Sequence, residues 1–269
     1  MTPAQPFHGR RMWLYVVGAA AMAFLLVPTL LIIPMSFSDA SSLGFPPPAW
    51  STRWYRNYWN SIEWTSSTWV SLKIAVLTTL VATPLGTAAA YGLRMAQGRL
   101  ANAIFLALVV PLVVPVIFIA IGVFYLYARL NLLYTVTGLV LAHSTLALPF
   151  VVSLVSSALK SVDENLEKCA RSLGARRWQA FFTVTLPQIR FSIVSAALLA
   201  FLTSFDEVII ALLISGGANE TLTRKMFTTL RDQIDPTIAA ISAMLIAISV
   251  GCVFLFQILQ AKTDDQFSD

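Results

Sequence analysis

The sequence predicts an all-α polytopic membrane protein in which six transmembrane helices form a single domain over residues 1–269. Of the 269 residues, 57% are apolar and only 12% are charged, whereas soluble domains carry about 25% charged residues. Uncharged apolar runs of about 20 residues, the length that crosses a bilayer core of roughly 30 Å, also recur along the chain. We predict spans at about 12–34, 68–93, 101–128, 132–159, 190–214 and 237–260.

The first predicted span follows a polar segment that ends in Arg10 and Arg11, and no charge occurs from Met12 to Pro34. A secretory signal peptide has the same order of features. The apolar stretch is too long for a signal peptide, however, and no small-residue cleavage site follows it. We therefore expect a transmembrane helix with its amino end in the cytoplasm.

Residues 35–67 are predicted to form an outer connection, because the prolines at 46–48 prevent local helix formation. A cluster of Trp and Tyr residues follows the prolines, and such amphipathic rings favour the headgroup level of a bilayer. We expect a short helix on the outer interface. Interface anchoring is the simpler role for these rings, and Trp54 is a candidate for stacking on a substrate.

Prolines interrupt the next three spans at Pro84, Pro111, Pro115 and Pro149. They remove backbone hydrogen bonds and permit bends. Such bends suit helices that line a pathway, and they also occur in plain bundles. His143 lies alone in the fourth span, so we expect a buried, hydrogen-bonded histidine rather than a proton relay, and we expect no metal site.

The distribution of Lys and Arg predicts the orientation of the chain. With the amino terminus inside, the cytoplasmic segments hold more Lys and Arg than the outer segments, so we expect both termini in the cytoplasm of a bacterial inner membrane. The net charge of +5 is spread over short loops and does not indicate a nucleic-acid partner. The mixed charges of residues 215–236 are typical of a solvated outer face, which could also contact another protein.

Residues 160–189 interrupt the membrane pattern with polar sequence that is longer than a turn requires. Ser161 and Glu164 have the spacing of a capping box, which predicts the start of a helix. Gly174 occupies the position of a left-handed C-cap at the end of that helix.

A second short helix is predicted over about 176–184, and Pro187 follows it at the entrance of the fifth span, where its missing N–H costs least. Trp178, Phe181 and Phe182 give this helix an apolar face. Exposed aromatic residues mark contact surfaces, so this face packs either on its own bundle or on a cytoplasmic partner.

The string ARSLGARRWQAFFTVTLP resembles the cytoplasmic loop motif of permease subunits of ATP-binding-cassette (ABC) importers. That motif reads Glu-Ala-Ala, three residues, Gly, nine residues, a branched aliphatic residue, one residue and Leu-Pro. Ala170, Gly174, Val184, Leu186 and Pro187 match it in register.

Two positions depart from this motif, because Lys168 stands where the family has Glu and Cys169 replaces the first Ala. Glu167 is the neighbouring acid, but it lies about 100° around the helix. The resemblance implies a loop that docks a separate ATPase. Its candidate residues are Glu167, Lys168, Ala170, Gly174, Ala175, Leu186 and Pro187.

The resemblance extends to RWYRNYW in the outer loop and to AFLTSFDEVIIALLISG and LRDQIDPTIAAISAMLI in the last third of the chain. These stretches look most like the spermidine/putrescine group of permeases. The resemblance implies a non-enzymatic subunit that works with a second permease subunit, two ATPase subunits and an extracytoplasmic solute-binding protein. It implies a polyamine-like cation as substrate, with 4-aminobutyrate, another amino acid derivative or an opine as alternatives.

The sequence contains no Gly-rich phosphate-binding loop followed by Lys-Ser/Thr. We therefore expect no cofactor in this chain, and ATP and Mg²⁺ would be bound by the partner ATPase. A stand-alone proton-coupled secondary transporter is the alternative class. An intramembrane enzyme would need a nucleophile and base, or a metal constellation, and the sequence shows neither.

Asp206 and Glu207 interrupt the predicted fifth span. A charge at the bilayer centre costs roughly 2.5–3.5 kcal/mol on insertion scales, so these acids should not face lipid. They could line the pathway and attract a cationic substrate, with Thr203 and Ser204 as hydrogen-bond partners. Alternatively, they hold a structural network at a helix break, or the span ends near residue 205 and they lie close to the outer interface.

Overall fold

The computed structural model describes residues 12–96 and 98–266, with side chains described up to residue 251. Over these ranges the chain is helical and forms no β-strand, apart from two isolated bridges in loops. Arg10 and Arg11, which contribute to the predicted orientation, lie outside the described residues. The chain divides into two compact units, one spanning 62–228 and the other combining the residues on either side of it.

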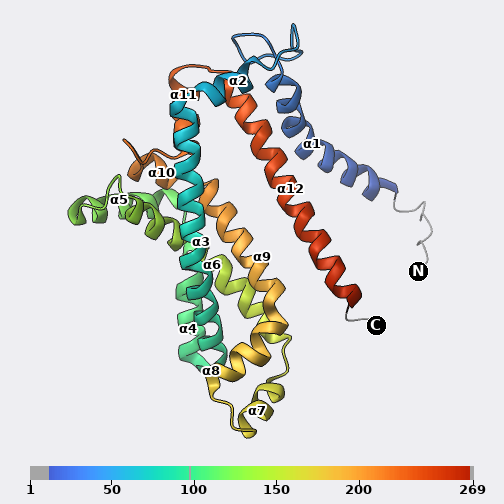
Figure 1. The fold of residues 1–269 in the computed structure, drawn as a ribbon, viewed down its shortest axis with the longest axis vertical. Coiled ribbons are helices and arrows are strands. Elements are labelled where there is room, and N and C mark those ends of the chain that lie inside the picture. The colour runs from blue at the N-terminus through green and yellow to red at the C-terminus, as the bar shows by residue number, and fades with distance from the viewer. Residues whose placement is uncertain (1–11, 97, 267–269) are drawn as a thin grey trace. The chain divides into compact units, whose positions relative to one another are not determined.

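The larger unit contains three long helices and a series of shorter ones (Figure 1). The long helices are α3 (Ile62–Ala96), α6 (Val136–Lys160) and α9 (Leu186–Phe205). The shorter elements are α4 (Gly98–Val109), η2 (Val110–Leu112), α5 (Val116–Leu130), α7 (Glu164–Ser172), α8 (Arg177–Ala180), η3 (Phe181–Thr185), α10 (Ile209–Ile214) and α11 (Leu222–Asp232), whose last residues belong to the other unit.

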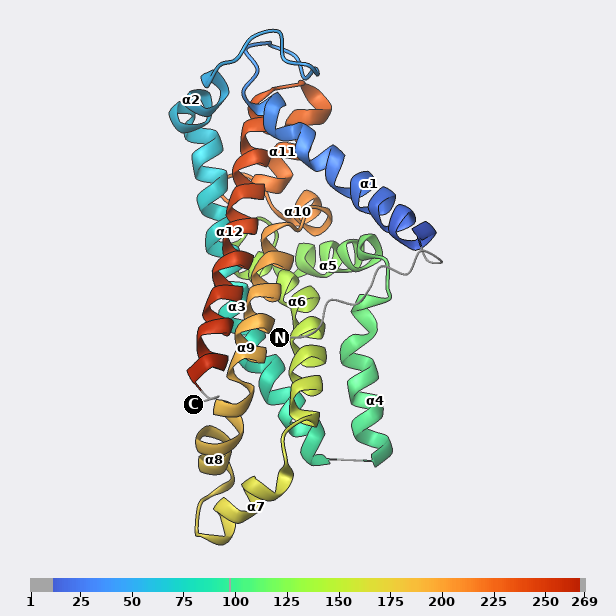
Figure 2. The ribbon, with the colours of Figure 1, turned by 90° about the vertical axis from the view of Figure 1, so that its right-hand side faces the viewer.

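The core of the larger unit lies where α3, α6 and α9 pack side by side, as Figures 1 and 2 both show. The contact faces consist largely of small residues, including Ala82, Ala147 and Ala196. Gly86 of α3 lies so close to α6 that a Cβ atom there would stand 2.6 Å from Cγ1 of Val151. Small residues let helix backbones approach closely in membranes, where packing rather than water exclusion drives association.

A second core cluster joins α3, α5, α6 and α10 around Ile74, Leu139 and Ile210. The sequence predicts a single span over 101–128, but the structure has two helices there, Gly98–Leu112 and Val116–Leu130, bent by 96°. Pro111 and Pro115 supply the physical reason, because neither can donate a backbone hydrogen bond that would continue the helix.

The smaller unit consists of α1 (Met12–Ser36), α2 (Arg53–Asn60) and α12 (Thr237–Gln266). The hydroxyl groups of Ser36 and Tyr55 lie 2.7 Å apart and join the end of α1 to α2. Asn57 of α2 donates a hydrogen bond of 2.8 Å to the hydroxyl of Thr237 at the start of α12. The predicted short helix after the prolines is thus present as α2.

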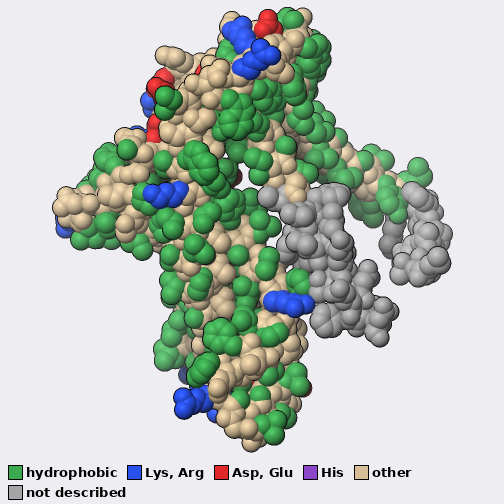
Figure 3. Space-filling model, viewed as in Figure 1, with side chains coloured by type: hydrophobic (Ala, Val, Ile, Leu, Met, Phe, Trp, Pro, Cys, Tyr) green, Lys and Arg blue, Asp and Glu red, His purple; other side chains and the backbone are tan. Residues whose placement is uncertain are grey.

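Four helical segments in the described chain are long and apolar enough to cross a membrane. They are α1, α3, α6 and the continuous segment Arg177–Phe205, and the bent pair makes a fifth if it counts as one span. α12 is apolar over Thr237–Gly251. Hydrophobic side chains are spread over much of the surface visible in Figure 3, as lipid contact requires, and the count of six spans remains a prediction.

Candidate functional site

The 160–189 segment begins with α7, whose N-cap differs from the predicted one. Asp163 is the N-cap, and its side chain accepts a hydrogen bond of 2.9 Å from the backbone N–H of Asn165. Ser161 instead ends α6 and donates its hydroxyl to the carbonyl of Ala158 at 2.7 Å. The predicted capping box of Ser161 and Glu164 is therefore wrong, because an aspartate closer to the first turn takes the capping role.

The left-handed turn expected after α7 is present at Gly174, which has a φ of +96°. Its backbone N–H donates to the carbonyl of Arg171 at 3.0 Å, and the N–H of Ala175 donates to the carbonyl of Ala170 at 3.1 Å. These bonds satisfy carbonyl groups that the helix end would otherwise leave unpaired. A glycine is favoured here because other residues rarely adopt this backbone conformation.

The side chain of Glu167 points into the bundle and is only 6% exposed. One carboxylate oxygen accepts a hydrogen bond of 2.5 Å from the hydroxyl of Tyr91 on α3, and the other accepts one of 3.1 Å from Thr185 in η3. A buried carboxylate is tolerated when its oxygens are hydrogen-bonded in this way. Glu167 therefore ties α7 to two other elements and is not part of the exposed surface.

A second tie joins α3 to the start of this segment through Arg94. Its Nη2 donates to the carbonyl of Val162 at 2.8 Å, and its Nε lies 3.7 Å from a carboxylate oxygen of Glu164. Two side chains near the end of α3, Tyr91 and Arg94, thus hold α7 in place. Helical spacing in the sequence does not identify these two residues, since it gives no signal for contacts between residues about 70 positions apart.

The remaining predicted docking residues are distributed over the surface of the segment. Lys168 is exposed and lies 3.6 Å from Glu164, one turn earlier on α7. Gly174 and Pro187 are exposed, whereas Ala170, Ala175 and Leu186 are half-buried. The exposed members lie on α7, at the turn after it and at the start of α9.

Four large apolar side chains on the same segment face solvent in the isolated chain. Leu173, beside the left-handed glycine, is 89% exposed, and Trp178 is 58% exposed. Leu166 and Phe182 are also exposed, whereas Phe181 packs on the ring of Tyr91 with centroids 4.6 Å apart. Of the two predicted alternatives, packing on its own bundle accounts for Phe181 but leaves these four side chains uncovered.

The second predicted helix is not separate from the span that follows it. α8 continues through the π-helical turn η3 into α9, so one helical path runs from Arg177 to Phe205. The side chain of Gln179 accepts a hydrogen bond of 2.8 Å from the backbone N–H of Arg176 at its start. Pro187 lies in the first turn of α9, directly after the π-helical turn, and the helical path continues through it.

Asp206 and Glu207 lie at a break between α9 and α10. Asp206 is exposed, whereas Glu207 is half-buried and accepts a hydrogen bond of 2.8 Å from the backbone N–H of Ile210. The backbone carbonyl of Glu207 also accepts from the hydroxyl of Thr223 at 2.8 Å. This geometry agrees with two of the predicted alternatives, a structural network at a helix break and a span that ends near residue 205. Of the two acids, Asp206 is the one whose side chain is exposed to a ligand.

Ser204, whose spacing offers a hydrogen-bond partner for an acid, contacts His143 instead. Nδ1 of His143 lies 2.9 Å from the hydroxyl of Ser204 and 3.1 Å from its carbonyl oxygen. The ring is 1% exposed. His143 is thus the buried, hydrogen-bonded histidine that the sequence predicts, and it links α6 to α9.

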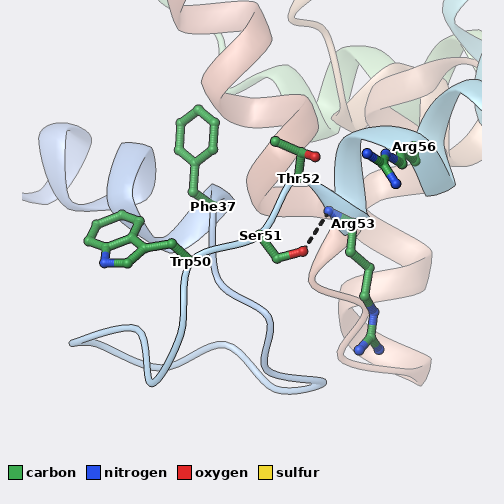
Figure 4. A pocket seen from close by; sticks show the side chains of 6 residues that line it. All are labelled: Phe37, Trp50, Ser51, Thr52, Arg53 and Arg56. Atoms are coloured by element: carbon green, nitrogen blue, oxygen red, sulfur yellow. Dashed lines mark hydrogen bonds between the residues drawn. The ribbon is translucent and has the colours of Figure 1, made fainter.

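Trp54 is fixed within the outer connection of the smaller unit. It is 8% exposed, its indole N–H donates to the carbonyl of Ala40 at 3.2 Å, and Arg53 lies 4.3 Å from its ring centre. A neighbouring cavity of about 640 Å³ is lined by Trp50 and Arg56, among others (Figure 4). Trp50, which is 70% exposed, is the open aromatic residue beside this cavity.

In the described part of the chain, no group of three or more His, Cys, Asp or Glu residues could hold a metal ion. The charges around α11 are largely paired. Lys225 forms an ion pair of 2.7 Å with Glu63, and Arg224 lies 3.8 Å from Glu220.

Residues 82–267 match the family described as binding-protein-dependent transport system inner membrane component. The chain is 32% identical over 265 residues to the putrescine transport system permease protein PotI of Escherichia coli strain K12, covering 96% of this chain and 94% of that protein. It is 26% identical to the spermidine/putrescine transport system permease protein PotC of Haemophilus influenzae, covering 96% and 98% of the two chains.

The fold resembles that of a bacterial ABC transporter involved in import of the acidic polysaccharide alginate. The TM-score is 0.71 at 14% identity, over 96% of this chain and 99% of the transporter chain. A second structure of an alginate ABC transporter, in complex with its alginate-bound periplasmic protein, gives a TM-score of 0.68 at 14% identity and covers 94% and 96% of the two chains.

Proposed function

The chain belongs to the family of binding-protein-dependent transport system inner membrane components, and from this premise we propose that it conducts a small cationic amino compound, of polyamine type, into the cytoplasm. It is a permease subunit of an ABC importer in a bacterial inner membrane and not an enzyme. An extracytoplasmic binding protein delivers the substrate, and a separate ATPase drives the transport cycle. Both termini lie in the cytoplasm.

The ATPase docks on the exposed part of the 160–189 segment. The observation that carries this proposal is the group of uncovered apolar side chains at Leu166, Leu173, Trp178 and Phe182. Aromatic anchors on a rigid support are typical of strong protein contacts. α7, which carries part of this surface, is held in place by the hydrogen bonds of Glu167 to Tyr91 and of Arg94 to the carbonyl of Val162.

The ATPase changes the permease by binding one conformation better than another. A ligand shifts an equilibrium only through such a difference in affinity. ATP and Mg²⁺ are held by that partner, and two ATPase subunits face two permease subunits, of which this chain is one. The second permease is a different chain in this proposal.

Asp206 contributes the negative charge that attracts a cation near the outer end of α9. Its exposure supports this role, while the hydrogen bonds of Glu207 support a structural one. The relatives named for putrescine and spermidine support a polyamine-like substrate. 4-Aminobutyrate, another amino acid derivative or an opine are the alternative substrates for the same architecture.

The experiment that tests the docking surface is purification of the tagged full-length chain from its native membrane. The ATPase that accompanies the chain is then quantified. Leu173→Ser combined with Trp178→Ser should reduce its recovery at least about tenfold, because two anchors of a hot spot each contribute more than 1 kcal/mol. Recovery equal to that of the unaltered chain would refute the docking proposal.

Phe227→Ser in α11 is the matched control, since it also removes a large apolar side chain, one that is 46% exposed, from a helix outside the 160–189 segment. It should leave recovery of the ATPase unchanged. A loss of recovery in the control would show that the effect is not specific to the proposed surface and would equally count against it.

A further inference from the structure

A pocket of about 560 Å³ lies between α3, α4 and α6 at the point where α7 begins. Figures 1 and 2 show these helices together at the end of the larger unit that carries α7 and α8. Its volume is in the range of small-molecule sites, about 300–1,000 Å³. The pocket is not explained by the docking surface, whose apolar side chains do not line it.

Two basic side chains line this pocket, Arg94 from α3 and Lys160 from the last turn of α6. The only acid among its lining residues is Glu164, whose carboxylate lies 3.7 Å from Arg94, beyond hydrogen-bond distance. The charged groups therefore leave a net positive charge in the pocket. α4 begins at Gly98, so the positive end of its dipole lies near the same site.

Polar groups in the pocket also lack partners. Nη1 of Arg94 and the hydroxyl of Ser156 are shielded from solvent and have no hydrogen-bond partner among the described residues. The whole side chain of Arg94 is nearly buried, at 11% exposure. Buried donors of this kind are costly to leave unpaired, and an oxyanion is the acceptor that an arginine fork matches best.

The rest of the lining is apolar and includes Leu93, Phe105 and Leu159. A free inorganic anion has no apolar part that could bind to these residues. A phospholipid can place its phosphate group on the basic side chains and its glycerol and upper acyl carbons against the apolar ones. Basic pockets between transmembrane helices on the cytoplasmic side bind the head groups of anionic lipids.

We propose that this pocket binds the phosphate head group of an anionic phospholipid from the inner leaflet, and that the bound lipid steadies the start of the docking segment. The proposal rests on the proposed function only for placing this end of the bundle at the inner face of the membrane. Val162 and Glu164 belong both to the pocket lining and to the connection that carries α7. An occupied pocket therefore restricts the same backbone that Arg94 holds through the carbonyl of Val162.

The test is native mass spectrometry of the full-length chain, purified with the subunits that accompany it and stripped of lipid. The assembly is incubated with phosphatidylglycerol, with phosphatidylcholine, and with phosphatidylglycerol in the presence of excess inorganic phosphate. We expect phosphatidylglycerol adducts in preference to phosphatidylcholine adducts, and no displacement by inorganic phosphate. Displacement would assign the pocket to free phosphate and overturn the lipid proposal.

Lys160→Gln is the informative variant, because Lys160 is exposed at a helix end, so its loss should not disturb the fold. It should reduce phosphatidylglycerol adducts about fivefold, the typical contribution of one basic residue near an anionic lipid surface. Asn102→Leu, which removes a polar lining side chain from α4, should also weaken binding.

Arg99→Gln is the matched control, since it removes one positive charge from α4 at a position that does not line the pocket. Its adducts should equal those of the unaltered chain. Equal adducts in Lys160→Gln, Asn102→Leu and the control would overturn the proposal. The lipid measurement does not depend on recovery of the ATPase, so a failure of the docking proposal would be seen separately.

Discussion

Tyr91→Phe is expected to loosen α7 without removing any apolar contact. The substitution deletes only the hydroxyl that donates to Glu167 at 2.5 Å. The ring stays in place against Phe181, with the centroids 4.6 Å apart. Glu167 keeps its second bond, from Thr185 at 3.1 Å. The change therefore isolates one of the ties between α3 and α7.

The magnitude follows from the kind of bond that is lost. A hydrogen bond to a charged group contributes about 1.5–3 kcal/mol, and its loss leaves one oxygen of a buried carboxylate short of a donor. Tyr91 itself is half-buried, so water can reach part of the vacated space, and we expect the lower end of this range. A difference of about 1.4 kcal/mol corresponds to a factor of ten in an equilibrium constant.

Hydrogen–deuterium exchange of the full-length chain in nanodiscs measures this effect directly. The amides of α7, Glu164–Ser172, should exchange about tenfold faster in Tyr91→Phe. Tyr125→Phe is the control, because it removes the same hydroxyl group from a residue that is 68% exposed on α5, a different helix. Exchange of α7 that is the same in both variants would refute the view that Glu167 fastens this helix.

The remaining predictions concern the packing of α3 and the acids after α9. Gly86→Val should lower the free energy of unfolding by about 1–3 kcal/mol in thermal or denaturant melts, because the new Cβ would stand 2.6 Å from Cγ1 of Val151. Gly92→Val is the control, since a Cβ at Gly92 has nothing within 4 Å, and it should change the free energy of unfolding only through helix propensity. Asp206→Asn should reduce substrate-stimulated ATPase activity of the reconstituted importer, and unchanged stimulation by a cationic substrate would remove this residue from the pathway. Glu207→Gln should cost less than about 1 kcal/mol of stability, because the amide oxygen can still accept from Ile210 and only the negative charge at the start of α10 is lost, and stimulation should be retained.

Much of the fold could be predicted from apolar run length and proline positions. The helical class, the short helix of the outer connection and the left-handed turn at Gly174 all follow from local sequence, because each depends on residues within a few positions. The family could be identified because the spacing from Ala170 to Pro187 is fixed by the geometry of one loop, and the match to residues 82–267 confirms it.

The inward direction of Glu167 could not be predicted in the same way. Glu167 and Lys168 differ by about 100° in helical phase, and the sequence alone does not say which of them faces the bundle. The deciding partners, Tyr91 and Thr185, lie 76 and 18 positions away. The arrangement with Glu167 buried has the lower free energy, because two hydroxyl groups donate hydrogen bonds to its carboxylate while Lys168 remains exposed to water.

The break after Phe205 could not be located from hydropathy, because the residues on both sides of the two acids are apolar. The span predicted over 190–214 therefore joins α9 and α10, which the structure separates. The side chain of Glu207, one residue before the N-cap Val208, supplies the physical reason, since it accepts the N–H of Ile210 in the first turn of α10 and so supports a new helix start. A capping bond of this kind competes with helix continuation at short polar interruptions.

The uninterrupted helical path from Arg177 to Phe205 joins the two ends of this part of the chain in one continuous rod. At 1.5 Å per residue, α9 alone extends about 30 Å, and Asp206 sits at its far tip. A tilt of a few degrees at the Arg177 end would displace the carboxylate of Asp206 sideways by ångströms, because the helix between them moves as a rigid body. The π-helical turn at Phe181–Thr185 is wound more widely than the α-helix that follows it, so it sets the rotational phase of α9 relative to α8.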